Sequence, residues 1–519
     1  MEHKTAASVS PYEDKSPDGG TSVAVRHVDG DERAALRRGF TPLAMLGLAF
    51  GLINSWTAMA ASLPVILGTG GPVAMVYGLL VSAAGTLATG VSMAEMCHVL
   101  PMAGGQYDWA YMLAPHRLRN PLAFVTGWLA CAGWVALLPA GCAFCTNFVL
   151  GLVAFWHDTF PAAPWHTFLV MCAFGFLTFV LNAFGIRVLP ALDRFAGAWS
   201  VAGMLVVCAT LLATSAGAYQ PPRAVFAQFT NETGWPDGLA FVLGLLQSTL
   251  GLTAFDAASH MVEEMPRPAV NAPKVMVLAI ALGAVTGWIF TIVLLFCLRD
   301  FAAVLASPAG PLLEIYYQAT GHRAGATCLL MFNLLAMTLS IQAVNTVSSR
   351  MVMSFARDRG LGHLSRFVAP IHPTLRVPLW AVAFVTLWVV VISLIYLGSS
   401  AALNGIIASA VVFLQASYAV PIALVLVRGE RCYAGHTRSW SLGRARRPVN
   451  ALALAFLSLT SVCFLFPPAL PVAGSSMNYA VVVFGAVLLM CGATWAIDGR
   501  RNFHGPGDVE DRLAAAKGA

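Results

Sequence analysis

Two apolar stretches of the chain, residues 41–67 and 237–263, are each interrupted near the middle by polar side chains. Hydroxyl and carboxamide groups at such depth can hydrogen-bond a small polar solute, and any unwound backbone beside them supplies further N–H and C=O ligands. This chemistry is recognition rather than catalysis. The residues that we expect to contact a solute at the two interruptions are Ile53, Asn54, Ser55, Trp56, Thr57, Gln247, Ser248, Thr249 and Gly251.

An acid follows the second interruption directly, at Asp256. A carboxylate within a membrane is costly unless it is paired, protonated or hydrated. Asp256 is therefore a candidate for proton coupling. Two other roles remain open: direct contact with a cationic substrate, and bracing the start of the helix that follows.

Aromatic residues lie beside both interruptions. Trp56 and Phe255, with Trp134 as a third member, could enclose an ammonium group by cation–π attraction. Packing between helices is the alternative for all three rings.

Composition identifies the solvent of these stretches as lipid. Of the 519 residues, 58% are hydrophobic and only 10% are charged, whereas soluble domains carry about 25% charged residues. This excludes a soluble enzyme and a nucleic-acid-binding module. No Gly-x-x-x-x-Gly-Lys nucleotide motif is present, and we expect no cofactor and no metal site. Cys142 and Cys145 form a C-x-x-C pair inside an apolar run, which we interpret as packing.

A helix needs about 20 apolar residues to cross a bilayer. This length predicts an all-α polytopic membrane protein with twelve transmembrane helices. The expected spans are 41–67, 72–97, 121–154, 164–185, 190–214, 237–263, 273–298, 323–354, 377–397, 401–427, 449–468 and 477–497.

The distribution of positive charge predicts that both termini are cytoplasmic. With that orientation, Lys and Arg residues concentrate on the inner side, and the outer loops hold only Arg223, Arg299 and Arg323. A glycosylation sequon at Asn231 then falls in an outer loop. We expect residues 1–40 to form a disordered cytoplasmic tail and residues 499–519 a second cytoplasmic tail, around a transmembrane domain at 41–498.

The two interrupted helices are five helices apart. This spacing is typical of an inverted repeat in which the first helix of each half is broken at the substrate site. Polar residues that simply join neighbouring helices are the alternative.

Several segments together resemble the amino acid–polyamine–organocation superfamily, and within it the fungal amino acid/choline permeases, which include choline and GABA permeases. The segments are GLINSWTAMAASLP (51–64) followed by GGP, AEM (94–96), PMAGGQYDWAYMLAP (101–115), TGW (126–128), FDAASHMVEEMPRP (255–268) and SSRMVMSFARDRGLG (348–362). The resemblance covers about residues 40–500.

The resemblance implies a leucine-transporter-like fold, with a 5+5 inverted repeat at about 41–214 and 237–427 and two peripheral helices at 449–497. It also implies plasma-membrane transport of small nitrogenous solutes, commonly with proton symport. Some relatives use a Lys in helix 5 for coupling. Residues 190–214 contain no mid-membrane Lys, so that mechanism is not carried over.

Charged residues at the inner side form the expected gate. We expect Glu95 to pair with a cytoplasmic-side Arg or to cap backbone, with proton coupling as the alternative. Glu263 and Glu264 are expected to pair with Arg267 at the inner mouth, and solvated loop charges are the alternative. The cluster that follows helix 8 is expected to help close this gate: Arg350, Arg357, Asp358 and Arg359. The outer segment 300–322 is a candidate lid.

These features predict a proton-coupled importer of a small amino acid, choline-like or related nitrogenous solute that works by alternating access. Its partners are the small-molecule substrate, a coupling proton and the lipid bilayer, with no nucleic acid. An exporter or exchanger of a specialised nitrogenous metabolite such as an alkaloid is one alternative. A non-transporting nutrient sensor of the same fold is another.

Overall fold

The computed structural model describes residues 41–157, 159–160, 163–398, 400–433, 439–474, 477–507 and 509. The predicted tail 1–40 lies outside these residues, as does most of the predicted tail 499–519. The first half of the chain forms the helices α1 (Pro42–Ile53), α2 (Ser55–Ala61), α3 (Leu63–Ile66), α4 (Gly71–Val99), α5 (Gln106–Leu113), η2 (His116–Leu118), α6 (Arg119–Trp156), α7 (Pro164–Phe184), α8 (Leu189–Thr214) and α9 (Pro222–Phe226).

The second half continues the helical pattern. It forms α10 (Asp237–Leu250), α11 (Ala257–His260), η3 (Val262–Glu264), α12 (Pro268–Cys297), α13 (Phe301–Ala306), α14 (Pro311–Thr320), α15 (Arg323–Arg357), η4 (Gly362–Leu364), α16 (Ser365–Val368), α17 (Leu379–Gly398), α18 (Ser400–Arg428), η5 (Gly429–Tyr433), η6 (Gly443–Ala445), α19 (Arg446–Cys463), α20 (Ala480–Thr494), η7 (Trp495–Gly499) and α21 (Arg500–Asn502).

Ten helical segments within the described residues are long and apolar enough to cross a membrane. Each of them overlaps a span expected from the sequence. The two remaining expected spans behave differently. In 237–263 the continuous helix α10 stops at Leu250, and in 449–468 the helix α19 begins with two arginines. The protein is an all-helical, multi-pass membrane protein, and the count of twelve stays a prediction.

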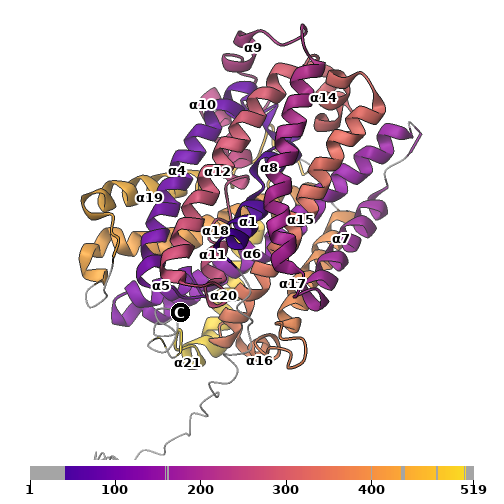
Figure 1. Ribbon diagram of the computed structural model, residues 1–519. Helices are drawn as coiled ribbons and strands as arrows, with labels where there is room; N and C mark the ends of the chain where they lie inside the picture. The colour runs from indigo at the N-terminus through magenta and orange to yellow at the C-terminus, as the bar shows by residue number, and fades with distance from the viewer. Residues whose placement is uncertain are drawn as a thin grey trace, which may run out of the picture.

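The connections separate to opposite ends of the helical bundle. Figure 1 shows α9 and α14 at one end and α5, α16 and α21 at the other. Helices α9 and α14 lie in segments expected on the outer side of the membrane. Helices α5, α16 and α21 lie in segments expected on the cytoplasmic side. The chain also continues as helix beyond residue 498 through α21, and Phe503 is fully buried. The start of the expected tail therefore packs onto the bundle.

Helix α1 runs through the middle of the bundle and lies against α8, α12 and α15 (Figure 1). It ends because Asn54 adopts the left-handed conformation, with φ 39° and ψ 49°, and α2 begins at the next residue. Asn is one of the few L residues that visits this region readily. A polar residue at mid-helix thus breaks the helix where the sequence predicted.

The second break is longer than the first. Between the end of α10 and the start of α11 the chain leaves the helix, and Ala254 has a positive φ of 70°. A non-glycine residue in this region is strained, and such strain persists where the surrounding packing enforces it. Ala254 and Phe255 are both buried.

Two glycines set the spacing of α1 and α8. A Cβ added at Gly197 would lie 2.8 Å from the Cα of Gly47, and one added at Gly47 would lie 2.8 Å from the carbonyl oxygen of Asp193. Both neighbours are backbone atoms that cannot move aside. Small residues permit this close approach of helices in a membrane.

We therefore expect Gly197→Ala to lower the apparent melting temperature of the purified protein by several degrees, because overpacking a tight contact costs about 1–3 kcal/mol. Gly485→Ala in α20 is the matched control, since an added Cβ there meets no atom within 4 Å of the described structure. The control should match or exceed the parent, as Ala favours helix by about 1 kcal/mol over Gly. Equal stability of the two variants in a thermal-unfolding assay would contradict close α1–α8 contact.

Candidate substrate-binding centre and gates

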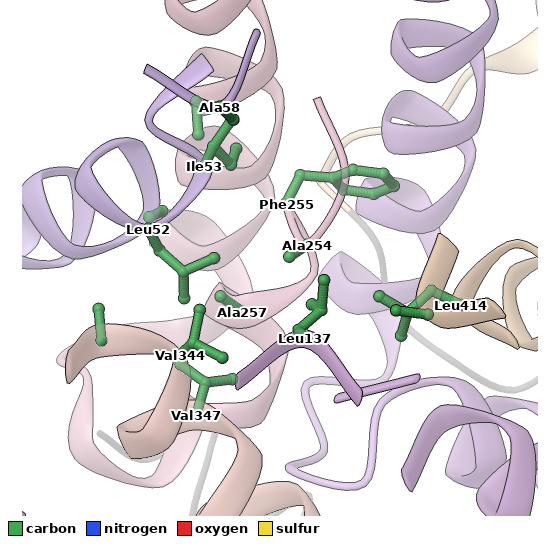
Figure 2. Close-up of a cluster of buried hydrophobic side chains, with 14 of the residues drawn as sticks. Leu52, Ile53, Ala58, Leu137, Ala254, Phe255, Ala257, Val344, Val347 and Leu414 are labelled. Carbon is green, nitrogen blue, oxygen red and sulfur yellow. The ribbon is translucent and has the colours of Figure 1, made fainter. Parts of the chain in front are cut away.

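The two broken segments contact each other in the interior. The Gln247 side chain donates through Nε2 to the carbonyl oxygen of Met59, at 2.6 Å, and Gly251 packs against the same methionine. Both breaks also share one apolar cluster. Figure 2 shows this cluster, whose labelled members come from both breaks and from α6, α15 and α18: Leu52, Ile53, Ala58, Leu137, Ala254, Phe255, Ala257, Val344, Val347 and Leu414.

The ten residues predicted to bind substrate are all buried, with no side chain more than 4% exposed. The structure brings the two groups to one region, since Gly251 lies near Ser55 as well as Met59. It does not give all ten the same surroundings. The polar groups of the first break are partly unsatisfied, whereas those of the second break have partners.

The first break holds two polar atoms without partners among the described residues: Nδ2 of Asn54 and Oγ of Ser55. The other end of the Asn54 amide is fixed, because the Ser200 hydroxyl donates to its Oδ1 at 3.1 Å, and Trp56 donates to Ser200 in turn at 3.0 Å. An unpaired buried polar group costs about 1–3 kcal/mol. Asn54 and Ser55 thus keep unused hydrogen-bonding groups in the interior.

The second break presents a different picture at its polar residues. The hydroxyls of Ser248 and Thr249 hydrogen-bond Ser82 of α4 at 2.8 and 3.2 Å, and Gln247 is bonded to Met59 as described above. These contacts match the alternative of polar residues that join helices. Gln247, Ser248 and Thr249 therefore have hydrogen-bond partners within the protein.

Asp256 is a buried acid with partners on several helices. Its Oδ2 accepts hydrogen bonds from Gln106 Nε2 at 2.5 Å and Trp134 Nε1 at 3.1 Å, and it faces His260 Nε2 at 3.1 Å. Its Oδ1 accepts from the Tyr418 hydroxyl at 2.7 Å. The carboxyl group thus joins α5, α6, α11 and α18. It does not cap α11, at whose N-cap position it lies.

His260 and Asp256 hold a proton between them by geometry. The second ring nitrogen of His260, Nδ1, lies 2.9 Å from the carbonyl oxygen of Ala103, which can only accept. A neutral imidazole has one donor nitrogen, so it satisfies one acceptor and leaves the other nitrogen as an acceptor. Either the imidazole is protonated on both nitrogens, or Asp256 carries the proton and donates it to Nε2.

The three aromatic rings expected to form a box have separate partners. Trp56 packs edge-on against Phe290 with a centroid distance of 5.3 Å, and Phe255 packs against Tyr418 at 5.2 Å. Trp134 packs edge-on against the His260 ring at 5.7 Å. Trp134 and Phe255 therefore flank the Asp256 network, while Trp56 lies with α12 beside the first break.

Two ion pairs join the segment after the second break to α15. Glu264 pairs with Arg350 at 3.0 Å, and both side chains are only 3% exposed. Glu263 pairs with Arg357 at 2.8 Å, and this pair is about one-third exposed. The expected partner Arg267 is exposed and stands at the start of α12 instead. The acids were correctly placed near one another, but their partners lie on a helix about 90 residues away in sequence.

Asp193 is a residue whose importance the sequence analysis missed. It lies in α8, is 1% exposed, and neither carboxyl oxygen has a hydrogen-bond partner among the described residues. It is close enough to Arg350 and Glu264 to interact with their charges. The available signal was an acid inside the expected fifth span, because a buried unpaired carboxyl is costly and seldom without function.

Glu95 is bonded to the loop before α19. It forms a two-point ion pair with Arg446, with both N···O distances at 2.8 Å, and it accepts from the backbone N–H of Leu442 at 2.8 Å. The Ser441 hydroxyl donates to it as well, at 3.1 Å. These contacts are the arginine pairing and backbone capping expected for Glu95.

The outer segment 300–322 folds into the helices α13 and α14. Tyr316 of α14 is fully buried and donates to Oδ1 of Asn333 at 2.8 Å, and the amide of Asn333 reaches Thr57 at 3.4 Å. A chain of hydrogen bonds thus connects the candidate lid with the first break.

The sequon residue Asn231 is also structured. Its side-chain nitrogen donates to the carbonyl of Trp235 at 2.7 Å and to Asp237 at 2.9 Å. A glycan on this nitrogen would replace one of these bonds. Glycosylation of Asn231 therefore stays a prediction.

The described residues contain no cluster of His, Cys, Asp and Glu arranged to hold a metal ion, and Cys142 and Cys145 are unpaired. The arrangement instead combines buried broken helices, a shared apolar cluster and ion pairs at one end of the bundle. These features define a polytopic membrane protein with two broken helices in its interior, an arrangement typical of membrane transporters.

The chain belongs to the amino acid permease family of the amino acid–polyamine–organocation superfamily, because residues 40–487 match the family described as amino acid permease. A choline transporter of Saccharomyces cerevisiae is 32% identical over 94% of this chain and 86% of its own length. A swainsonine transporter of Arthroderma benhamiae is 27% identical, over 90% and 92% respectively.

Among solved structures, Mhp1, a nucleobase-cation-symport-1 family transporter in a closed conformation with bromovinylhydantoin bound, aligns with 93% of this chain and 97% of its own. The TM-score is 0.48 and the identity 16%. The family and its relatives are permeases, so the protein is a transporter of small molecules and not an enzyme.

We expect Glu264→Gln to lower the apparent melting temperature markedly. Removing one member of a buried ion pair costs about 3–5 kcal/mol, because Arg350 is left as an uncompensated buried charge. Glu263→Gln is the matched control, since an ion pair as exposed as that with Arg357 is worth about 0–1 kcal/mol. The double variant Arg350→Leu with Glu264→Leu should recover much of the loss. Equal melting temperatures of the two single variants would show that the buried pair stabilises the protein no more than the exposed pair does.

Proposed function

We propose that the protein is a secondary active transporter that moves a choline-like compound, a small amino acid or a related nitrogenous solute by alternating access. We further propose proton symport, and twelve transmembrane helices with a 5+5 inverted repeat and two peripheral helices. The observation that carries the proposal is the direct contact of two broken helices around buried, partly unsatisfied polar groups. Irregular backbone at membrane depth is tolerated only where it is enclosed in this way.

The plasma membrane is the location that we propose, with both termini cytoplasmic. The charge asymmetry of the loops supports this orientation, and the two ion pairs at Glu263 and Glu264 then lie on the inner side. The lid helices α13 and α14 then lie on the outer side. The relative named a choline transporter supports a nitrogenous cation among the candidate substrates.

Substrate recognition would combine three kinds of group. Asn54 and Ser55 offer polar atoms that have no partner in the described structure. Phe255 and Tyr418 offer ring faces that attract a cation. Asp256 supplies a carboxyl group beside these rings, and loss of the proton from its pair with His260 would leave a negative charge that favours a nearby ammonium group. A solute with a compact cationic head and a small polar end fits this set.

Alternating access would follow from two closures on either side of the centre. On the proposed inner side, Glu264 binds Arg350 and Glu263 binds Arg357. On the proposed outer side, Tyr316 reaches the first break through Asn333. Both closures are formed together in this conformation, and all ten predicted substrate contacts are buried. Opening to either side would require only one set of contacts to break.

We propose that the Asp256–His260 pair carries the coupling proton. The geometry of its acceptors supports a proton held between the two residues, and the pair lies next to Phe255. Substrate entry that moves α11 would change the distance between the pair and Ala103, and thereby the affinity for the proton. Asp193 is the competing candidate, since it is buried, unpaired and close to Arg350.

An exporter or exchanger of a specialised nitrogenous metabolite is the second candidate function. The relative named a swainsonine transporter favours it. The direction of net flux distinguishes the two candidates: an importer accumulates label in cells under an inward proton gradient, and an exporter depletes preloaded label. A sensor of the same fold would bind ligand without moving it.

The binding centre predicts that Ser55→Ala lowers uptake at least tenfold, because it removes a hydroxyl that has no other use in the described structure. Thermal stability should hold or rise, since an unpaired buried polar group is lost with it. The control is Ser417→Ala, whose hydroxyl bonds only the carbonyl of Leu414 within its own helix. The assay is uptake of radiolabelled choline and GABA by cells with matched surface expression. Unchanged uptake by Ser55→Ala would place the cavity elsewhere.

The coupling proposal predicts that Asp256→Asn abolishes accumulation against a gradient while it spares counterflow exchange, because an amide cannot release a proton. We would reconstitute the variant in liposomes that contain a pH-sensitive dye and impose an inward proton gradient. The parent should concentrate substrate and acidify the lumen, and the variant should do neither. Asp193→Asn, tested in parallel, should retain both activities. The reverse pattern would assign coupling to Asp193 and leave Asp256 as a structural brace.

A further inference from the structure

A cavity lined by residues of neither helix break lies at the connection between α18 and α19. Its volume is about 510 Å³. One wall is the end of α18, with Val425 and Leu426. Another part of the wall is Arg444 of η6, together with Arg446 and Arg447 at the start of α19. The cavity lies beside Glu95 at the end of α4, because Arg446 belongs to both.

The positive charge of this cavity is only partly neutralised. Arg446 is committed to Glu95 and, at 3.2 Å, to Glu430, whose exposed side chain stands at the rim. Arg444 and Arg447 are exposed and form no ion pair within the part of the chain that the structure describes. Two arginine side chains therefore remain available to an anion.

The arginines also lie at the unfavourable end of a helix. The N-terminus of a helix carries a partial positive charge and favours anions, and cations suit the opposite end. The 18-residue helix α19 begins at Arg446 without a side-chain cap. Repulsion between this helix end and the arginines is relieved when an anion binds between them.

An independent observation comes from Asn450, one turn further along α19. It lines the cavity, it is 1% exposed, and neither its amide nitrogen nor its amide oxygen has a partner among the described residues. A buried carboxamide without any hydrogen bond is unusual, because nearly all buried polar groups are paired. A ligand in the cavity would supply the missing partner.

We propose that this cavity binds a phosphate group, held by Arg444, Arg447 and the amide of Asn450 at the start of α19. Arginine matches phosphate because its planar fork donates two parallel hydrogen bonds. The cavity is too large for a bare anion, and Val425 and Leu426 offer apolar contact to whatever carries the phosphate. Two sources share this chemistry: the headgroup of an anionic phospholipid, and a soluble phosphorylated metabolite.

Occupancy of the site has a structural consequence. The same loop is held to α4 by the Arg446–Glu95 pair, and Ser439 and Trp440 contact His98 at the end of α4. A phosphate bound beside Arg446 would fix the α18–α19 connection against α4. This proposal does not depend on the substrate or on the coupling ion of the transporter.

The test uses the full-length protein in detergent and three probes: short-chain phosphatidylinositol 4-phosphate, short-chain phosphatidylcholine and inorganic phosphate. Ligand binding to the folded state raises its melting temperature. We expect the phosphoinositide to raise it and phosphatidylcholine to leave it unchanged. A comparable rise with inorganic phosphate would assign the site to a soluble phosphate compound, and no rise would assign it to the lipid. No rise with either phosphate probe would overturn the proposal.

Variants distinguish a specific binding site from non-specific electrostatic attraction. Arg444→Gln with Arg447→Gln should weaken binding at least tenfold, whereas Arg500→Gln with Arg501→Gln, of equal charge change, should not. Asn450→Leu changes no charge and should still weaken binding at least tenfold. The unliganded melting temperature of each variant reports its folding. Normal binding by Asn450→Leu, or equal losses in both arginine pairs, would reduce the effect to general electrostatics and overturn the proposal.

Discussion

The structure depends on one constraint: backbone that leaves a helix inside a membrane must be enclosed by protein. Each break frees N–H and C=O groups that lipid cannot satisfy. The carbonyl of Leu52, at the first break, is accordingly taken by the hydroxyl of Ser340 in α15, at 2.6 Å. The second break is enclosed between α4, α6 and α18. Two breaks buried against each other thus place polar backbone and side-chain groups together in the interior.

Asp256 determines how the surrounding helices meet at this centre. Its carboxyl group receives donors from three helices besides its own segment, so a change in its protonation acts on α5, α6 and α18 at once. Networks of this kind rigidify the core when every member is satisfied, and they are sensitive to the loss of one donor. The proposed proton coupling at Asp256 would act through these contacts.

The sequence predicted the features that depend on local pattern. Polar residues inside apolar runs identified both broken helices, and Asn54 broke its helix because its type tolerates the left-handed conformation. The membrane class and ten of the spans follow from apolar length alone. The family resemblance is confirmed by the match over residues 40–487.

Features that depend on tertiary contacts could not be predicted in the same way. Glu264 pairs with Arg350 rather than with the neighbouring Arg267, because helix packing and not sequence distance decides which cation reaches a buried acid. The inference that His260 and Asp256 share a proton depends on the carbonyl of Ala103, which lies 157 residues away in the chain. Gln247 was expected to contact a solute, and its side chain hydrogen-bonds the backbone of Met59, which joins α10 to α2.

The most direct test of the account is a density map of the protein with substrate bound. The sample would contain whichever of choline, GABA and spermidine raises the melting temperature most, and an unliganded map would serve as the reference. The account predicts ligand density between Asn54 and Phe255, with Ser55 in hydrogen-bond distance and both breaks retained. Ligand density at another place in the bundle, with the space between the breaks filled by protein as before, would contradict it.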